Sequence, residues 1–165
     1  QTFSAGTDEL DKALLLGQGV KVSNNGGANA VAVAEHAIWM MVTINHKLDL
    51  QIESVKAGKW MAGVTGATSE YTSLVDKQVG IIGLGRIGSR VAKRLAGWEC
   101  NVVYHDPITF DAEYVSNTGA TRMALDELIA TSDIITLHVP LDRVTRQMMS
   151  TEQFKAMKNT AVLEW

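Results

Sequence analysis

A glycine-rich stretch at residues 79–90, VGIIGLGRIGSR, carries the spacing that most directly suggests chemistry. Gly83, Gly85 and Gly88 follow the G-x-G-x-x-G pattern of a phosphate-binding turn. An apolar run precedes the turn and a helical pattern follows it, so an anion would meet free N–H groups at the positive end of a helix. Gly83 permits a tight turn, Gly85 lets the backbone approach a pyrophosphate, and Gly88 lets helix and strand pack closely. The alternative is a glycine-rich turn that binds nothing.

An acidic residue follows the turn close to the distance at which dinucleotide-binding sheets carry one, about 20 residues on. Asp106 stands 18 residues after Gly88, at the end of the run CNVVYHD. A carboxylate at this place accepts hydrogen bonds from both hydroxyls of an adenosine ribose and repels a 2′-phosphate. No Arg or Lys follows closely in sequence, so NAD is predicted over NADP. Asp106 could otherwise simply open a turn with Pro107.

A third candidate segment is LHVPL, which contains His138, Val139 and Pro140 at the end of the run DIITLHV. Ligands of doubly wound sheets lie across the carboxyl ends of the strands. The loops after the first, second and fourth strands should therefore converge on a cofactor. Pro140 restricts the preceding backbone away from helix, which leaves this loop open at the rim.

Alternating strand and helix patterns must position these residues. Strand-like runs lie at 78–83, 100–106, 119–123, 133–139 and 161–165, and helical patterns lie between them at about 86–97, 124–131 and 151–158. This alternation is typical of a parallel α/β sheet. Together with the glycine turn it predicts an α/β fold, a Rossmann-type doubly wound parallel sheet that is incomplete.

The first part of the chain predicts a short βα piece and a long helix. Residues 10–19 suit a short helix closed by Gly17 or Gly19, and residues 20–24 suit a strand. Apolar residues then recur at spacings of three and four from about Val31 to Lys56. The first half of this stretch is apolar nearly all round, which predicts burial between domains or against another subunit. Residues 61–73 are predicted to be a linking loop.

Composition sets the class of protein. The chain has 165 residues, of which 46% are hydrophobic and 20% charged, as expected for one globular domain. The net charge is −3 and no basic run stands out, which argues against nucleic acid or an anionic membrane as a partner. The single cysteine, Cys100, has no internal disulfide partner and suits a core thiol in a reducing compartment. No secretory or membrane-spanning pattern is seen, so a cytoplasmic location is expected.

Several stretches match one family in order and spacing. They are SAGTDELD, NNGGANAVAVAEH, GKW, VGIIGLGRIG, YHDP, LDELIATSDIITLHVPL, TRQMM and FKAMKNTAVL, and they run from about Ser4 to Leu163. Through them the chain resembles the D-isomer-specific 2-hydroxyacid dehydrogenases, which include phosphoglycerate dehydrogenase, D-lactate dehydrogenase, glyoxylate/hydroxypyruvate reductase and formate dehydrogenase. The resemblance implies that residues 1–27 are a C-terminal remnant of the substrate domain. Residues 28–165 would be the NAD-binding Rossmann domain, truncated at its C-terminal end.

The resemblance implies a set of NAD-binding residues. The set is Val33, Gly83, Gly85, Arg86, Ile87, Gly88, Asp106, Pro107, His138, Val139, Pro140 and Thr145. Arg86 and Ile87 would meet the pyrophosphate mainly through backbone groups, and Val33 would touch the nicotinamide end. Val139, Pro140 and Thr145 would line the adenine and ribose side.

The resemblance also implies substrate contacts. Backbone groups at Ala5 and Gly6 would face the substrate carboxylate. Asn29 aligns with a substrate-contacting position of formate dehydrogenases, although it could instead cap the long helix. The substrate implied is a small 2-hydroxy or 2-keto acid.

The chemistry of the family depends on three further groups. An Arg polarises the substrate carbonyl, and a His held by an acidic residue passes the proton while hydride moves to or from nicotinamide. These groups follow the AVL strand in the family, whereas this chain reads Glu164-Trp165 there. We therefore expect a fragment without the catalytic residues, inactive by itself, from an enzyme that forms a homodimer through the helix at 31–56. A non-catalytic NAD(H)-sensing module and an NAD-dependent formate dehydrogenase are the alternatives.

The remaining histidines offer no competing site in the sequence. His36 suits a hydrogen-bonded structural residue in a buried helix, His46 an exposed or interface residue, and His105 the adenosine side. No histidine pair has zinc-ligand spacing with cysteine. The tryptophans expected to be packing residues are Trp39, Trp60 and Trp98.

Overall fold

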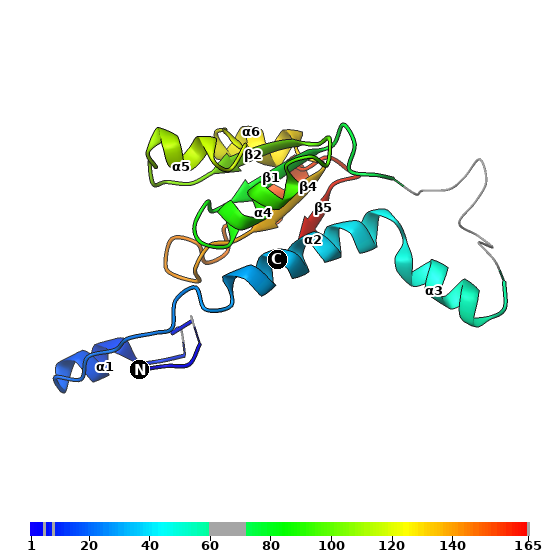
Figure 1. The fold of residues 1–165 in the computed structure, drawn as a ribbon. Helices are drawn as coiled ribbons and strands as arrows, with labels where there is room; N and C mark the ends of the chain where they lie inside the picture. Colours follow the sequence, from blue (N-terminus) through cyan, green and yellow to red (C-terminus); the bar gives the residue numbers. More distant parts are fainter. Residues whose placement is uncertain (5, 8, 60–71, 165) are drawn as a thin grey trace.

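The sheet is fully parallel and has five strands. The computed structural model describes residues 1–4, 6–7, 9–59 and 72–164. The strands are β1 (Gln78–Ile82), β2 (Asn101–His105), β3 (Thr121–Arg122), β4 (Ile134–Leu137) and β5 (Val162–Glu164). Their order is β3-β2-β1-β4-β5, and Figure 1 shows β2, β1, β4 and β5 side by side in this order. The order reverses between β1 and β4, and the carboxyl ends of these two strands mark the crevice in which doubly wound sheets bind ligands.

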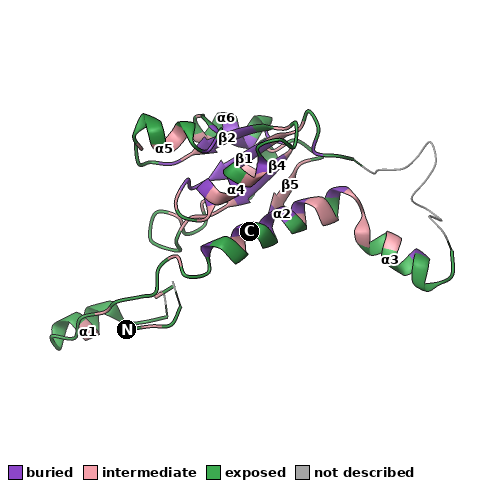
Figure 2. Cartoon of the chain, viewed as in Figure 1, coloured by how far each residue is buried: buried purple, intermediate pink, exposed green. Residues whose placement is uncertain are grey.

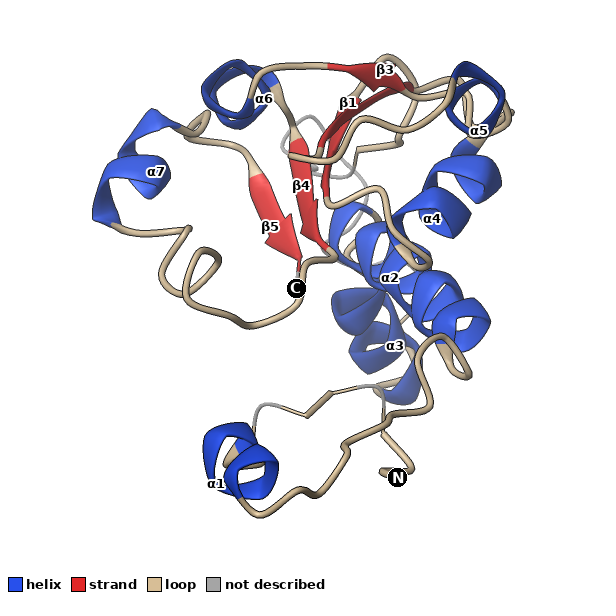
Figure 3. Cartoon of the chain, turned by 90° about the vertical axis from the view of Figure 1, so that its left-hand side faces the viewer, coloured by secondary structure: helices blue, strands red, loops and turns tan. Residues whose placement is uncertain are grey.

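Helices cover both faces of the sheet. They are α1 (Lys12–Gly17), α2 (Ala30–Asn45), α3 (Leu48–Lys56), α4 (Gly88–Leu95), α5 (Ala112–Ser116), α6 (Leu125–Thr131) and α7 (Thr151–Ala156). Figure 3 shows α2 and α4 on one side of the strands and α6 and α7 on the other. The predicted doubly wound α/β fold is thus confirmed in strand order and in the two helical layers.

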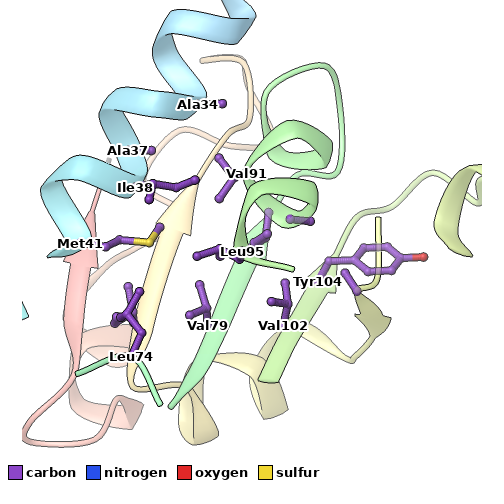
Figure 4. Close-up of a cluster of buried hydrophobic side chains, with 14 of the residues drawn as sticks. Ala34, Ala37, Ile38, Met41, Leu74, Val79, Val91, Leu95, Val102 and Tyr104 are labelled. Atoms are coloured by element: carbon purple, nitrogen blue, oxygen red, sulfur yellow. The ribbon is translucent and has the colours of Figure 1, made fainter. Parts of the chain in front are cut away.

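Two hydrophobic clusters hold these layers together. The first joins α2 and α4 to the sheet through residues such as Met41, Val91 and Val79, all fully buried (Figure 4). The second joins α6 to the opposite face and includes Leu128 and Ile135. Strand residues alternate between the clusters because neighbouring side chains point to opposite faces. Figure 2 shows the buried residues concentrated in the strands and the helix faces against them.

The predicted single helix at 31–56 is wrong, because the chain breaks into α2 and α3. Lys47 adopts a left-handed conformation with φ 50°, which no α-helix continues through. Just before it, the Asn45 side chain donates to the Met41 carbonyl at 2.8 Å. The apolar spacing runs across both helices, so periodicity alone did not reveal the break.

The segment before α2 lies apart from the sheet (Figure 1). α1 ends as predicted, with Gly19 just beyond it at φ 72°. The predicted strand at 20–24 is wrong: the segment is extended but pairs only irregularly with the N-terminal residues. Its backbone hydrogen bonds are Thr2 N–H to Ser23 O at 2.9 Å and Asn25 N–H to Ser4 O at 3.3 Å. Most of the predicted loop at 61–73 lies outside the described residues.

In the described part of the chain, none of the helices has the length and apolar character needed to cross a membrane.

Candidate cofactor site

The glycine turn joins β1 to α4, and each glycine meets a different constraint. Gly83 has φ 96°, and a Cβ there would lie 2.7 Å from the carbonyl oxygen of His138. A Cβ on Gly88 would lie 2.0 Å from the Gly83 carbonyl oxygen, so α4 starts directly against the strand end. A Cβ on Gly85 would meet no atom within 4 Å. Gly83 and Gly88 thus serve internal packing, whereas Gly85 faces open space where a phosphate fits.

Backbone donors surround that open space. Among the described residues, no acceptor is found for the N–H groups of Gly85, Arg86 and Ile87. They precede α4, whose first residue is Gly88. Unpaired N–H groups at a helix start bind anions through hydrogen bonds and the helix dipole. The turn therefore fits a pyrophosphate.

Asp106 ties the end of β2 to this turn. It is only 7% exposed. Its Oδ2 accepts from the Leu84 N–H at 2.8 Å, and its Oδ1 accepts from the Ile108 N–H at 2.8 Å. The second contact is the local turn expected as the alternative role of Asp106, and Pro107 lies exposed within it. Each carboxylate oxygen has a further lone pair, so the structural contacts leave room for ribose hydroxyls.

Two residues that the sequence did not single out support the same region. Arg122 of β3 donates to the Asp106 backbone carbonyl at 2.8 Å and to Thr109 Oγ1 at 3.2 Å, so a cation lies beside the backbone of Asp106. The Tyr114 hydroxyl donates to the Leu84 carbonyl at 2.9 Å. Tyr114 lies on α5, which was not predicted, although Asp111 caps that helix by accepting from the Tyr114 N–H. This cap is the sequence signal that would have located α5.

The Arg86 side chain turns away from the helix towards the segment before α2. A Cβ on Gly26 would lie 2.5 Å from Arg86 Nη1, and one on Gly27 would lie 2.7 Å from Arg86 Cδ. The guanidinium stem thus lies against the glycine pair. The arrangement agrees with a phosphate contact made mainly by the Arg86 backbone.

The loop after β4 closes the other side of the turn. The His138 N–H donates to the Ile82 carbonyl at 2.8 Å, so the loop continues the sheet beyond β4. A Cβ on Gly83 would lie 2.9 Å from Val139 Cγ1, which places Val139 beside the glycine turn. Pro140 is exposed, and the Thr145 hydroxyl donates to the Pro140 carbonyl, which holds the loop in a compact turn.

A polar network lies at the carboxyl ends of β4 and β5. Thr136 Oγ1 donates to Glu164 Oε2 and lies 2.8 Å from His138 Nε2. Burial lowers the pKa of His138 from 6.5 to about 4, so its imidazole is neutral at pH 7. Burial raises the pKa of Glu164, against the opposing influence of the Thr136 hydrogen bond and the charge of His36. The sequence pattern did not indicate this network.

The residues expected to contact substrate lie in the segment before α2 and at the start of that helix. Gly6 is exposed and its carbonyl accepts from Ser4 Oγ at 2.8 Å, whereas Ala5 lies outside the described residues. Asn29 occupies the N-cap position of α2, but its side chain makes no capping hydrogen bond. Val33 follows in the first turns of α2 and is half-buried. The Asn29 side chain is thus not committed to the helix end.

The other candidates for chemistry are placed away from the turn or at the surface. His36 lies on the exposed side of α2 and not on its buried face, and its ring centre is 5.4 Å from that of Trp39. Trp39 and Trp98, expected to be packing residues, are 57% and 39% exposed, while Trp60 lies outside the described residues. Cys100 is half-buried, and burial raises its pKa.

No potential metal site is found among the described residues: no three His, Cys, Asp or Glu side chains gather there.

The strand order, the open glycine turn and the acid at the end of β2 define a dinucleotide-binding domain of the Rossmann class. Residues 38–163 match the family model described as "D-isomer specific 2-hydroxyacid dehydrogenase, NAD binding domain". The chain therefore belongs to the D-isomer specific 2-hydroxyacid dehydrogenase family, and its cofactor is NAD.

Comparison with individual proteins agrees with this family. The chain is 35% identical over 162 residues to a D-3-phosphoglycerate dehydrogenase of Archaeoglobus fulgidus, covering 96% of this chain and 29% of that protein. It is 33% identical to a formate dehydrogenase of Chaetomium thermophilum, and the match covers 95% of this chain and 43% of that protein. The structure of D-lactate dehydrogenase from Aquifex aeolicus complexed with NAD and lactic acid superposes with a TM-score of 0.87 at 29% identity. The superposition covers 97% of this chain and 46% of that chain. The chain thus spans less than half the length of these relatives.

Proposed function

We propose that this chain is the NAD-binding part of an oxidoreductase that transfers hydride between NAD and a D-2-hydroxy acid/2-keto acid pair. The observation that carries the proposal is the open space over Gly85, bordered by the unpaired N–H groups of Gly85, Arg86 and Ile87. Asp106 lies at the adjoining strand end, where an acceptor for ribose hydroxyls is required. The relatives that bind NAD or carry dehydrogenase names support the same activity.

The residues of this chain would bind and orient the cofactor. When bound, NAD supplies the hydride acceptor or donor. The turn N–H groups would hold the pyrophosphate, and Asp106 would hold the adenosine ribose. Pro107, Val139, Pro140 and Thr145 would border the adenosine side, and Val33 the nicotinamide end. The Arg, acidic residue and His that act on substrate would lie outside residues 1–165, so the chain alone would not turn over substrate.

The substrate proposal is a small 2-hydroxy or 2-keto acid. Gly6 and Asn29 would approach it from the segment before α2, together with Ala5. A formate substrate is the second candidate, favoured by the similarity to a formate dehydrogenase and by the uncommitted Asn29 side chain. We also propose that the division between the remnant of the substrate domain and the NAD-binding domain falls between residues 27 and 28. A cytoplasmic location is proposed as well.

Calorimetric titration of the purified chain with NAD and NADP tests the proposed function. Binding of NAD with clear preference over NADP is the expected result. Absence of NAD binding by a folded chain would refute it. Reduction of pyruvate, glyoxylate or hydroxypyruvate by residues 1–165 alone would refute the proposal that the catalytic groups lie elsewhere.

We further propose a homodimer through α2 and α3, in place of one continuous helix. The outer surfaces of these helices expose large apolar side chains, namely Val31, Trp39, Ile44, Leu50, Ile52 and Val55. Apolar surface of this extent on a helix pair is typical of a protein interface. A sedimentation experiment that finds a dimer would support the proposal.

A further inference from the structure

We propose that His138 presents its ring Nδ1 as a hydrogen-bond acceptor to the nicotinamide half of bound NAD, and that Thr136 and Glu164 are positioning residues that keep the ring proton on Nε2. This role rests on the proposed binding of NAD. It gives a function to the polar network of Thr136, His138 and Glu164, which the binding of the cofactor at the glycine turn does not explain.

The hydrogen bonds of Thr136 determine which ring nitrogen carries the proton. A threonine hydroxyl has one proton, and here it is donated to the Glu164 carboxylate. Oγ1 lies 2.8 Å from His138 Nε2, and while its own proton is held by an ionised Glu164 it can only accept, so this arrangement assigns the ring proton to Nε2. A neutral imidazole has a single N–H, which leaves Nδ1 with a free lone pair.

The backbone register fixes this geometry. Thr136 pairs directly with Glu164 across β4 and β5. His138 lies two residues beyond Thr136 and therefore on the same face of the sheet. Thr136 is fully buried and Glu164 is 6% exposed, so the two partners of the ring have little freedom to rearrange. The strand pairing thus orients the imidazole.

The Nδ1 atom is open to a ligand. It has no hydrogen-bond partner among the described residues. It is also not sealed in the interior, because the only buried side-chain N or O atom without a partner in the described part of the chain is Thr43 Oγ1. An unpaired, accessible acceptor at the carboxyl end of a central strand can receive a donor from a bound molecule.

The position of the network indicates which half of NAD it meets. Asp106 lies at the end of β2, on one side of β1, and His138 follows β4, on the other side. The His138 side chain shares the face of Thr136, whereas the neighbouring Val139 packs with the cluster on the α6 face and belongs to the adenosine side. A dinucleotide whose adenosine ribose is at Asp106 and whose pyrophosphate is at the glycine turn extends towards β4 with its second half. The charge of His36 on α2 acts on Glu164, and His36 lies one helical turn from Val33. The second half of NAD carries ribose hydroxyls and a carboxamide N–H₂, which are suitable donors.

The experiment combines one spectroscopic and one binding measurement. Long-range ¹H–¹⁵N correlation of the histidine rings in the ligand-free chain should show His138 protonated at Nε2. Thr136→Val removes the hydroxyl while keeping the shape, and Thr136→Ser keeps the hydroxyl. Titrated with NAD, the Val variant should bind more weakly than wild type, by up to about fivefold, because the ring is no longer held with its proton on Nε2, whereas the Ser variant should resemble wild type. Binding of ADP, which lacks the second half of NAD, should be equal in all three proteins.

Three results would overturn the inference: an Nδ1-protonated ring in wild type, equal weakening of ADP and NAD by Thr136→Val, or no weakening of NAD. A wild-type chain that binds neither ADP nor NAD would refute the proposed function itself. If Thr136→Val does not fold, Glu164→Gln replaces it, since it removes the charge and keeps the side-chain shape. This variant should lower the Nε2-protonated fraction and weaken NAD but not ADP, and an unchanged ring with unchanged NAD binding would count against the assignment.

Discussion

The Asp106 carboxylate accepts a hydrogen bond from the Leu84 backbone N–H at 2.8 Å, which fastens the end of β2 to the middle of the glycine turn. The residue proposed to bind ribose is therefore also a residue that shapes the pyrophosphate turn. Tyr114 reinforces the same point, because its hydroxyl donates to the Leu84 carbonyl. Both backbone polar groups of Leu84 are thus held by side chains from elsewhere in the chain, one after β2 and one on α5, which preorganises the turn before NAD arrives.

Asp106→Ala should lower both stability and NAD affinity. The substitution leaves the N–H groups of Leu84 and Ile108 without their acceptor, at a cost of about 1–3 kcal/mol in the free energy of unfolding. Urea denaturation measures the stability, and calorimetry measures NAD binding. Asp126→Ala is the matched control, since Asp126 is an exposed carboxylate on α6 and should change stability by less than about 0.5 kcal/mol. Equal effects of the two substitutions would contradict the role of Asp106.

Asp106→Ser should shift cofactor preference towards NADP. The substitution removes the negative charge that repels a 2′-phosphate, and Arg122 lies close enough to donate to the Asp106 carbonyl. A nearby Arg is what 2′-phosphate sites use. The ratio of NAD to NADP affinity should fall at least about tenfold, and adding Arg122→Gln should reverse much of the gain for NADP. An unchanged ratio in the single variant would show that Asp106 does not face the ribose.

Two glycines of the turn should respond in opposite ways to alanine. Gly88→Ala places a methyl group 2.0 Å from the Gly83 carbonyl oxygen, so α4 must shift, at a cost of about 1–3 kcal/mol in unfolding free energy. Gly85→Ala meets no atom within 4 Å and should leave stability nearly unchanged while weakening NAD, because the methyl group occupies the space proposed for phosphate. Thermal unfolding and NAD titration of both variants separate these effects. A Gly85→Ala protein that binds NAD normally would place the phosphate elsewhere.

The local sequence pattern was sufficient to predict the elements that form the cofactor site. The glycine turn, the acid after β2 and the Pro140 loop were all predictable, because each depends on a strand end and the few residues beyond it. The break between α2 and α3 at Lys47 was not predictable, since a left-handed residue can interrupt a helix without interrupting the apolar spacing of the sequence. Trp39 was expected to be a packing residue but is 57% exposed, because hydrophobicity alone does not say which side of a helix faces the sheet.

The partners of the site residues depend on register, which the sequence does not reveal. Arg122 meets the Asp106 carbonyl across 16 residues, and Tyr114 meets Leu84 across 30. Thr136 meets Glu164 across 28 residues because β4 and β5 pair in one particular register. A shift of one residue would turn either side chain to the opposite face. These supporting contacts therefore required the structure.

Acid should destabilise the chain through His138. Its pKa in the folded state is about 4, below the 6.5 of an unburied histidine, so between these values the unfolded chain binds a proton that the folded chain does not. The His138 contribution is thus present above pH 6.5 and is lost as the pH falls towards 4, by up to about 3 kcal/mol. The raised pKa of Glu164 acts in the opposite direction. Urea denaturation of wild type and His138→Gln across this range isolates the histidine effect, and parallel stability curves for the two proteins would contradict it.

Trp39→Lys should dissociate the proposed dimer. Trp39 is 57% exposed on α2, and Ile52 on α3 is 53% exposed, so each would bring an apolar side chain to the interface. Burying a large apolar side chain stabilises by about 1.5–3 kcal/mol, so a lysine in its place should raise the dimer dissociation constant at least about tenfold. Phe154→Lys is the control, because Phe154 is equally exposed, at 53%, but lies on α7, on the opposite side of the sheet (Figure 3). Sedimentation equilibrium should find Trp39→Lys largely monomeric and Phe154→Lys dimeric. Loss of the dimer in the Phe154 variant alone would place the interface on the α7 side instead.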